Sequence, residues 1–258
     1  MMRLLLLSIS TSCALQVPAA ASRHARVHCS TTEEIAVPWE DVKATLDDSV
    51  PVFVVTDQES RPLAASTVMC YTDSAAALVE LTRASDEFPG LNLKLQPVGL
   101  GTVLERARLG RCRLLPSEQD LEVARAANPE GEDWGSGAVP LFGCRQLQRQ
   151  RKGGVLATPL WLSVEDAKAA LREADPERTK DLELTCTSLQ RIVSLQIAGE
   201  VGPMDFVPSR AVVKYMQRSA AVEGEGDEAT PGVTRGMIAR SLPDWMKEDQ
   251  DDKYGLFG

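Results

Sequence analysis

The histidines decide which kinds of catalysis this chain could perform, because histidine is the commonest general base and metal ligand. The chain has two, His24 and His28, and both lie in its first 31 residues. We expect those residues to be removed as a targeting leader, which would leave the mature protein without histidine. That expectation excludes Ser-His-Asp and Cys-His nucleophilic catalysis and any histidine-ligated metal site.

Four cysteines follow the leader, at Cys70, Cys112, Cys144 and Cys186. No two of them have the C-x-x-C spacing of a redox or zinc pair. Each lies in or beside an apolar stretch typical of a strand, so we expect small, buried hydrophobic side chains. A disulfide in an oxidising compartment is the alternative, and the sequence does not give its pairing.

Glu165 and Asp166 are adjacent acids that resemble a carboxylate pair for acid–base catalysis. They come at the predicted start of a helix, where acids complement the positive end of the helix dipole, and we favour this structural role. Gly99 and Gly101 suggest a phosphate-binding loop, but the third glycine and the lysine that such loops require are missing. We therefore predict no catalytic, cofactor-binding or metal-binding residue, and hence a protein that is not an enzyme.

The charge divides the chain into three parts. The net charge is −9, which disfavours a nucleic-acid partner because phosphate binding depends on Lys and Arg. Residues 1–31 hold three arginines and no acid, whereas residues 219–258 hold nine acids and four bases. This division predicts a basic leader, a folded body over 38–218 and an acidic, largely disordered tail over 219–258.

The leader joins a signal-like stretch to a transit-like stretch. Leu4–Leu7 form an apolar run behind Arg3 that is too short for a bilayer, which needs about 20 residues. The following residues contain Ala, Arg and Ser and no acid, as in an organelle transit peptide. Together they predict a two-step address to a plastid with extra membranes; a plain secretory signal or a plain transit peptide is the alternative. No later stretch resembles a transmembrane helix, so we expect a soluble mature protein.

The body contains the same order of elements twice, in repeats over about 38–127 and 138–218. The stretches VPVF at 50–53 and VPLF at 139–142 open the first strand of each repeat. A strand, a helix, a strand, a helix, a strand and a helix follow each of them. We predict an α+β fold formed by internal duplication, with a pseudo-twofold arrangement and helices that cover one face of the sheet.

Four stretches of the body carry a family resemblance. They are VKATLDDSVPVFVVTD at 42–57, LLPSEQDLEVA at 114–124, AVPLFGC at 138–144 and TPLWLSVEDAKAAL at 158–171. In this order they resemble the Tic-twenty-two-like family, soluble components of the chloroplast protein-import translocon. The resemblance implies a chaperone-like protein of the plastid intermembrane space that binds precursor polypeptides without covalent chemistry. Its partners would be those precursors and the subunits of the envelope translocons.

A protein that holds unfolded chain needs exposed apolar surface or an open strand edge. Met69 and Tyr71 point to one face of a strand with alternating side chains. The repeat alignment matches them with Leu160 and Leu162. These four residues are the predicted polypeptide contacts, and burial in the core is the alternative.

A basic hairpin is predicted after VPLF. Its cations are Arg145, Arg149, Arg151 and Lys152. They predict a contact with acidic partners or with anionic lipid headgroups at a membrane surface, and a solvated hairpin tip is the alternative.

A second function stays open at this point. It is a small-molecule-binding protein or an enzyme of unknown reaction in a plastid or a secretory compartment. Such a protein would have one deep pocket with converging polar groups in place of a shallow apolar surface.

Overall fold

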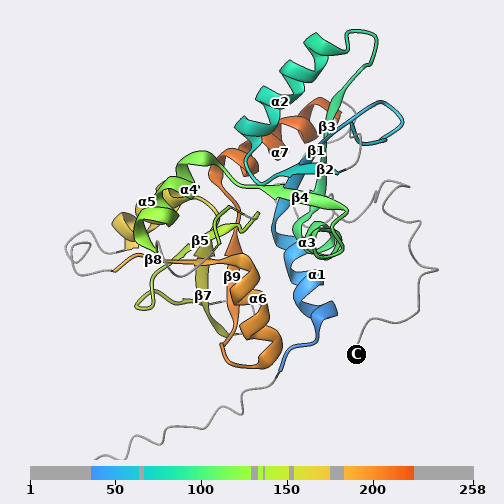
Figure 1. The fold of residues 1–258 in the computed structure, drawn as a ribbon. Helices are drawn as coiled ribbons and strands as arrows, with labels where there is room; N and C mark the ends of the chain where they lie inside the picture. Colours follow the sequence, from blue (N-terminus) through green and yellow to red (C-terminus); the bar gives the residue numbers. More distant parts are fainter. Residues whose placement is uncertain are drawn as a thin grey trace, which may run out of the picture. The chain divides into compact units, whose positions relative to one another are not determined.

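The structure is a computed structural model and describes residues 36–63, 67–128, 133–135, 137–150, 154–174 and 183–223. These residues form two sheets and a set of helices, which confirms an α+β fold (Figure 1). The first repeat supplies α1 (Trp39–Ser49), β1 (Pro51–Thr56), β2 (Val68–Tyr71), α2 (Ser74–Glu87), β3 (Lys94–Gly99), α3 (Leu100–Arg108), β4 (Cys112–Leu115) and α4 (Glu118–Ala127). The second supplies β5 (Pro140–Gly143), β6 (Arg149–Gln150), β7 (Leu156–Trp161), α5 (Val164–Ala174), β8 (Thr185–Ser188), α6 (Leu189–Ala198), β9 (Met204–Val207) and α7 (Arg210–Glu223).

The two sheets share one strand order. In the first sheet the order is β3-β1-β2-β4, with β1 antiparallel to β2 and β3 and with β2 parallel to β4. In the second, β5 is antiparallel to β7 and β8, and β7 is parallel to β9. The short strand β6 pairs with the first residues of β7. A duplication would produce such a match, and the duplication itself stays a hypothesis.

The first strand of each sheet begins at the predicted proline, Pro51 or Pro140, and every residue of both strands is buried. Their apolar runs do not alternate with polar residues because both faces of each strand are covered. Val52 and Val54 face the main core, whereas Phe53 faces a second cluster. Helices therefore cover both faces of β1, whereas the sequence pattern placed them against one.

The main core joins the two sheets. Its residues from the strands include Val54 of β1, Leu141 of β5 and Phe206 of β9, all at most 3% exposed. Leu46 of α1 and Leu104 of α3 fill the same cluster. Burial of this continuous apolar volume is the main favourable contribution to folding.

The last helix of each repeat packs against the sheet of the other repeat. Helix α4 lies against β5 and β8, and α7 lies against α2. Val212 and Met216 of α7 pack around Phe53 of β1. The outer face of each sheet is therefore completed by a helix from the other half of the chain.

Gly99 and Gly101 serve the packing of α1 against α3. A Cβ atom on Gly101 would lie 2.3 Å from the carbonyl oxygen of Lys43. The close approach lets Asp47 cap α3, since its carboxylate accepts hydrogen bonds from Thr102 N at 2.7 Å and from Thr102 Oγ1 at 2.8 Å. Burial raises the pKa of Asp47 above its usual value, and the bonds from Thr102 oppose that rise.

The strand register corrects the repeat alignment by one residue. Tyr71 pairs with Phe53, and Trp161 pairs with Phe142. Because Phe53 and Phe142 end the two matching stretches VPVF and VPLF, Tyr71 corresponds to Trp161 and not to Leu162. A shift of one residue in a strand moves a side chain to the opposite face of the sheet.

Candidate polypeptide-binding surface

Met69 and Tyr71 lie on the face of the first sheet that α2 and α7 partly cover (Figure 1). Tyr71 is half-buried and packs against the cluster around Phe53, whose ring meets that of Tyr215 edge-on at 5.1 Å between centroids. Met69 is 40% exposed. The sheet therefore offers a flexible thioether at the border of a packed aromatic cluster.

Further apolar side chains are exposed on α2 and just after it. Leu78 and Val79 of α2 are 41% and 70% exposed, and Phe88 and Leu91 follow its C-terminal end. The fully buried residues of α2 are small, such as Ala77. Helix α2 thus exposes Leu78 and Val79, while Leu81 on its inward side is half-buried.

Tyr71 is a hydrogen-bond donor at this surface. Its pKa is raised above the usual value, first by burial and then by the negative charge of Glu80, while Arg83 acts in the opposite direction. The phenol therefore stays protonated at neutral pH. It can donate to a backbone carbonyl of a bound chain while its ring packs on apolar side chains.

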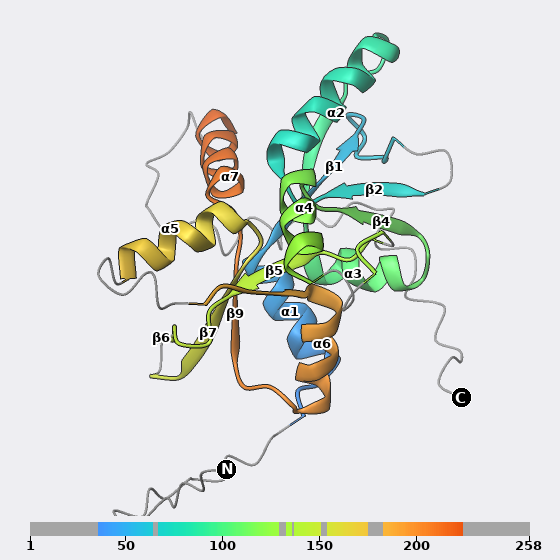
Figure 2. The same cartoon turned by 60° about the vertical axis from the view of Figure 1, so that its left-hand side comes forward.

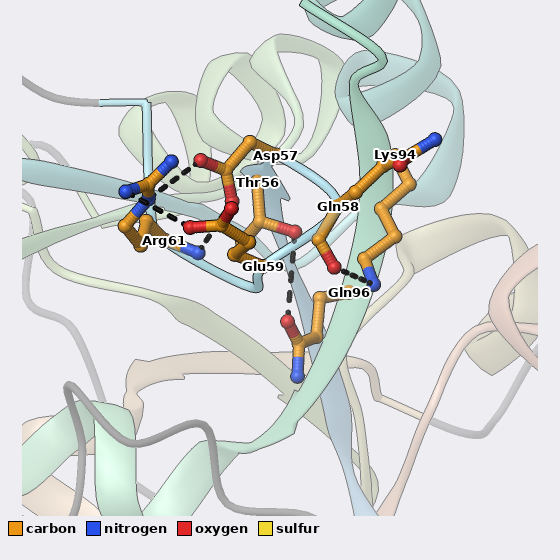
Figure 3. Close-up of polar contacts among 7 residues, drawn as sticks. All are labelled: Thr56, Asp57, Gln58, Glu59, Arg61, Lys94 and Gln96. Atoms are coloured by element: carbon orange, nitrogen blue, oxygen red, sulfur yellow. Dashed lines mark hydrogen bonds and ion pairs between the residues drawn. The ribbon is translucent and has the colours of Figure 1, made fainter.

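The turn that follows β1 holds a group of paired polar side chains (Figure 3). The Asp57 carboxylate accepts hydrogen bonds from the Arg61 amide at 2.9 Å and from Arg61 Nε at 2.7 Å. These bonds lower the pKa of Asp57. Arg61 also pairs with Glu59 at 2.9 Å, so each charge of the turn has a local partner.

The same turn is tied to the start of β3. Lys94 Nζ donates to the carbonyl of Gln58 at 3.2 Å, and the hydroxyl of the buried Thr56 donates to Gln96 Oε1 at 3.5 Å (Figure 3). These contacts fix the turn against β3.

Strand β3 lies at an edge of the first sheet, and Pro97 limits what can pair with it. Pro97 stands opposite Phe53, and since proline has no N–H, its nitrogen must face the open edge. An added strand would lose one of the hydrogen bonds that such an edge normally offers.

The other predicted contacts lie elsewhere. Leu160 and Leu162 are 5% and 6% exposed and belong to the main core, so neither presents a surface to a partner. Their burial follows from the strand register, which puts Leu160 in the position of the buried Cys70. The contact hypothesis is kept for Met69 and Tyr71, and no observation tests it.

The basic hairpin is described in part. Arg145 is exposed in the turn after β5, and Arg149 of β6 forms an ion pair with Asp205 at 3.5 Å. Arg151 and Lys152 lie outside the described residues. The predicted contact of this hairpin with acidic partners or lipid stays a prediction.

Cys70, Cys112 and Cys144 are free thiols. Cys70, Cys112 and Cys144 are buried, as expected, whereas Cys186 is half-buried. Cys70 and Cys112 are hydrogen-bonded to each other, which raises the pKa of Cys70 and lowers that of Cys112. Cys112 in turn donates to the carbonyl of Val103 at 3.2 Å.

Asp120 is an important residue that the sequence reasoning missed. It is 8% exposed, and its carboxylate accepts hydrogen bonds from the first amide of α5, Val164 N, at 2.9 Å and from Ser117 Oγ at 2.5 Å. Burial raises its pKa, the hydrogen bonds oppose the rise, and the negative charges of Asp73 and Asp166 add to it. The stretch Ser117-Glu-Gln-Asp120 resembles a capping box and could have indicated this role.

Glu165 and Asp166 lie in the first turn of α5, as predicted. Asp166 accepts a hydrogen bond from the first amide of α7, Arg210 N, at 2.7 Å. Together with Asp120 it forms a chain of caps that runs from α4 to α5 to α7. These carboxylates bind helix starts, which is a structural use of acids.

Within the described residues, no group of His, Cys, Asp and Glu side chains is arranged to hold a metal ion. Both histidines lie outside those residues. None of the described helices is both long and apolar enough to cross a bilayer. Exposed apolar side chains do occur among the described residues, at Met69 of β2 and at Leu78 and Val79 of α2.

Two solved structures with a similar fold are Tic22 proteins. The fold is similar to Anabaena Tic22, which is described as a protein-transport protein, with a TM-score of 0.55 and 18% identity over 70% of this chain and 97% of that chain. It is also similar to Tic22 from Plasmodium falciparum, with a TM-score of 0.52 and 19% identity over 70% of this chain and 98% of that chain. No protein-family model and no curated protein matches the sequence. The chain thus has a Tic22-like fold, which confirms the sequence resemblance at the level of the fold.

Proposed function

We propose that this protein is a non-enzymatic import factor that binds precursor polypeptides in the intermembrane space of a plastid envelope. The Tic22-like fold over 70% of the chain is the observation that carries the proposal, because the Anabaena protein of that fold is described as a protein-transport protein. The exposed side chains of Met69 and of Leu78 and Val79 support a role in holding polypeptide. Translocon subunits of the outer and inner envelope would be its further partners.

The mode of binding follows from the chemistry of the surface. Methionine side chains adapt to partners of different shape, so Met69 suits a protein that must accept many precursor sequences. Tyr71 beside it adds a hydrogen-bond donor that can bind any backbone carbonyl. A single exposed methionine and a tyrosine beside it would give modest affinity for one segment and fast release, as transport requires.

A binding assay with matched variants tests this surface. The variant Met69→Asp places a charge where an apolar segment would pack, and we expect its affinity for a fluorescent unfolded precursor to fall about tenfold. Leu156→Asp is the control, because Leu156 is 55% exposed but lies on β7 in the other sheet. Equal affinity of the two variants would reject Met69 as a contact residue.

Localisation and crosslinking test the function as a whole. A tagged copy should be found in the plastid envelope, and a photo-reactive group at position 69 should crosslink to precursors in transit. A secreted pool with no plastid signal would exclude an import factor whatever the result at position 69.

A further inference from the structure

A turn between α3 and β4 concentrates positive charge on one part of an acidic protein. The sequence Arg-Ala-Arg-Leu-Gly-Arg-Cys-Arg at 106–113 holds four arginines and no acid, whereas the whole chain carries a net charge of −9. Arg108, Arg111 and Arg113 are exposed, and all of the turn lies within the described residues. Figure 2 shows this turn at the right-hand side of the fold, where α3 passes into β4.

Leu109 lies at the tip of this basic turn. It is 61% exposed, and a Cβ atom on the next residue, Gly110, would meet no atom within 4 Å. Gly110 has a φ of +71°, which ends α3 and turns the chain sharply into β4. The fold therefore displays one large aliphatic side chain, with arginines before and after it, on a narrow protrusion.

Two of the arginines are held in place by the fold. The guanidinium of Arg108 lies over the ring of Trp39 at 4.6 Å from its centroid. Arg113 donates to the carbonyl of Gly135 at 3.2 Å. Such anchoring restricts these two side chains and reduces the conformational entropy that a bound partner would have to remove.

The equivalent turn of the second sheet has the opposite chemistry. It joins α6 to β9 and likewise begins with a glycine of positive φ, Gly199 at +74°. Its sequence, Gly-Glu-Val-Gly-Pro, contains one acid and no base. The fold therefore does not require positive charge at a turn of this kind. The arginines of the turn between α3 and β4 point to a partner that binds this turn and not the turn between α6 and β9.

We propose that the Arg108–Arg113 turn is a peripheral membrane contact that binds the surface of an anionic lipid bilayer. A protein partner of ordinary affinity would need about 800 Å² of surface, which a narrow turn does not offer. A bilayer needs no matching surface, because headgroup phosphates can surround the arginines while Leu109 enters the interface. The acidic body then points away from the membrane, since like charges repel.

Vesicle flotation tests this contact with the full chain and with a chain that begins at Glu34, where a separate compact unit starts. The vesicles contain phosphatidylcholine alone or phosphatidylcholine with phosphatidylglycerol. We expect binding to the anionic vesicles only, weakened by salt. Arg108→Gln/Arg111→Gln/Arg113→Gln should weaken it on the order of 100-fold, and Leu109→Ser about tenfold.

Matched controls separate this contact from general effects of charge. Arg83→Gln/Arg125→Gln/Arg172→Gln removes the same charge from exposed sites on other helices, and it should bind anionic vesicles nearly as the native protein does. Equal losses in the two triple variants would overturn the proposal, as would equal binding to neutral vesicles. The proposal would also be overturned if the protein bound anionic vesicles only after removal of the residues that follow Glu223. That result would mean that the acidic tail, and not a membrane, binds the turn in the full chain.

Discussion

Asp120 offers a sharp test of how the two halves are joined, because its buried carboxylate on α4 caps the start of α5. In Asp120→Ala the amide of Val164 would lose its acceptor in a buried position. An unpaired buried donor costs about 1–3 kcal/mol, so we expect the free energy of unfolding to fall by roughly 2 kcal/mol. In Asp120→Asn the side-chain oxygen can still accept from Val164, and the cost at neutral pH should be below about 1 kcal/mol.

The pH dependence gives the second part of this test. The pKa of Asp120 is raised in the folded protein, so between its unfolded value of about 4 and its folded value the native state binds more protons. Stability from this group is therefore fully present below the unfolded pKa and is lost as the pH rises through the folded pKa. The side chain of Asp120→Asn does not titrate. As the pH rises from the unfolded to the folded pKa of Asp120, the free energy of unfolding of the native protein should therefore fall relative to that of Asp120→Asn.

Urea unfolding at several pH values, followed by circular dichroism, measures both quantities. Glu118→Gln, in the same helix but exposed, serves as the control and should change stability by less than about 0.5 kcal/mol. The reasoning is refuted if the native protein gains stability over Asp120→Asn as the pH rises from about 4 to neutral. That result would mean that the hydrogen bonds outweigh burial and depress the pKa.

Three further variants or reagents address the packing. Gly101→Ala should lower the free energy of unfolding by about 1–3 kcal/mol, because its Cβ would lie 2.3 Å from the carbonyl oxygen of Lys43. Gly90→Ala should leave it nearly unchanged, since a Cβ there meets no atom within 4 Å. Equal urea midpoints for the two variants would contradict this prediction. Leu104→Ala should cost about 2–5 kcal/mol through a cavity in the main core, and a loss below 1 kcal/mol in calorimetry would show that the site collapses. A thiol reagent should modify Cys186 before Cys70 in the native state, and mass spectrometry that finds the reverse order would show that the first sheet opens more readily than its burial indicates.

The sequence was informative where one segment determines its own structure. The strands β1 and β5, opened by VPVF and VPLF, and the acids at the start of α5 were predicted correctly. The strand order of both sheets agrees with the proposed repeats. Each of these features depends on local propensity or on a periodicity that is visible within a few residues.

Other features could not be read from one segment at a time. Met69 is exposed and Leu160 is buried because the register of β2 and β7 against their neighbouring strands decides which face of the sheet each side chain points to. The sequence alignment of the two repeats was shifted by one residue in these strands, so it matched side chains on opposite faces. The roles of Asp120 and Asp47 depend on helices that are distant in sequence. Gly101 resembled part of a phosphate loop because glycine serves close helix packing and anion binding equally well.

The exchanged position of α7 has a consequence for the order in which the chain folds. Helix α4 is synthesised before the second sheet that it covers, but α7 comes last and covers Phe53 of the first sheet. In a chain that emerges N-terminus first, the outer face of the first sheet must wait until residue 223 is available. Contacts of such high sequence separation form slowly and leave apolar surface exposed meanwhile. During its own synthesis or transport, this protein would therefore itself need the kind of protection that we propose it gives to others.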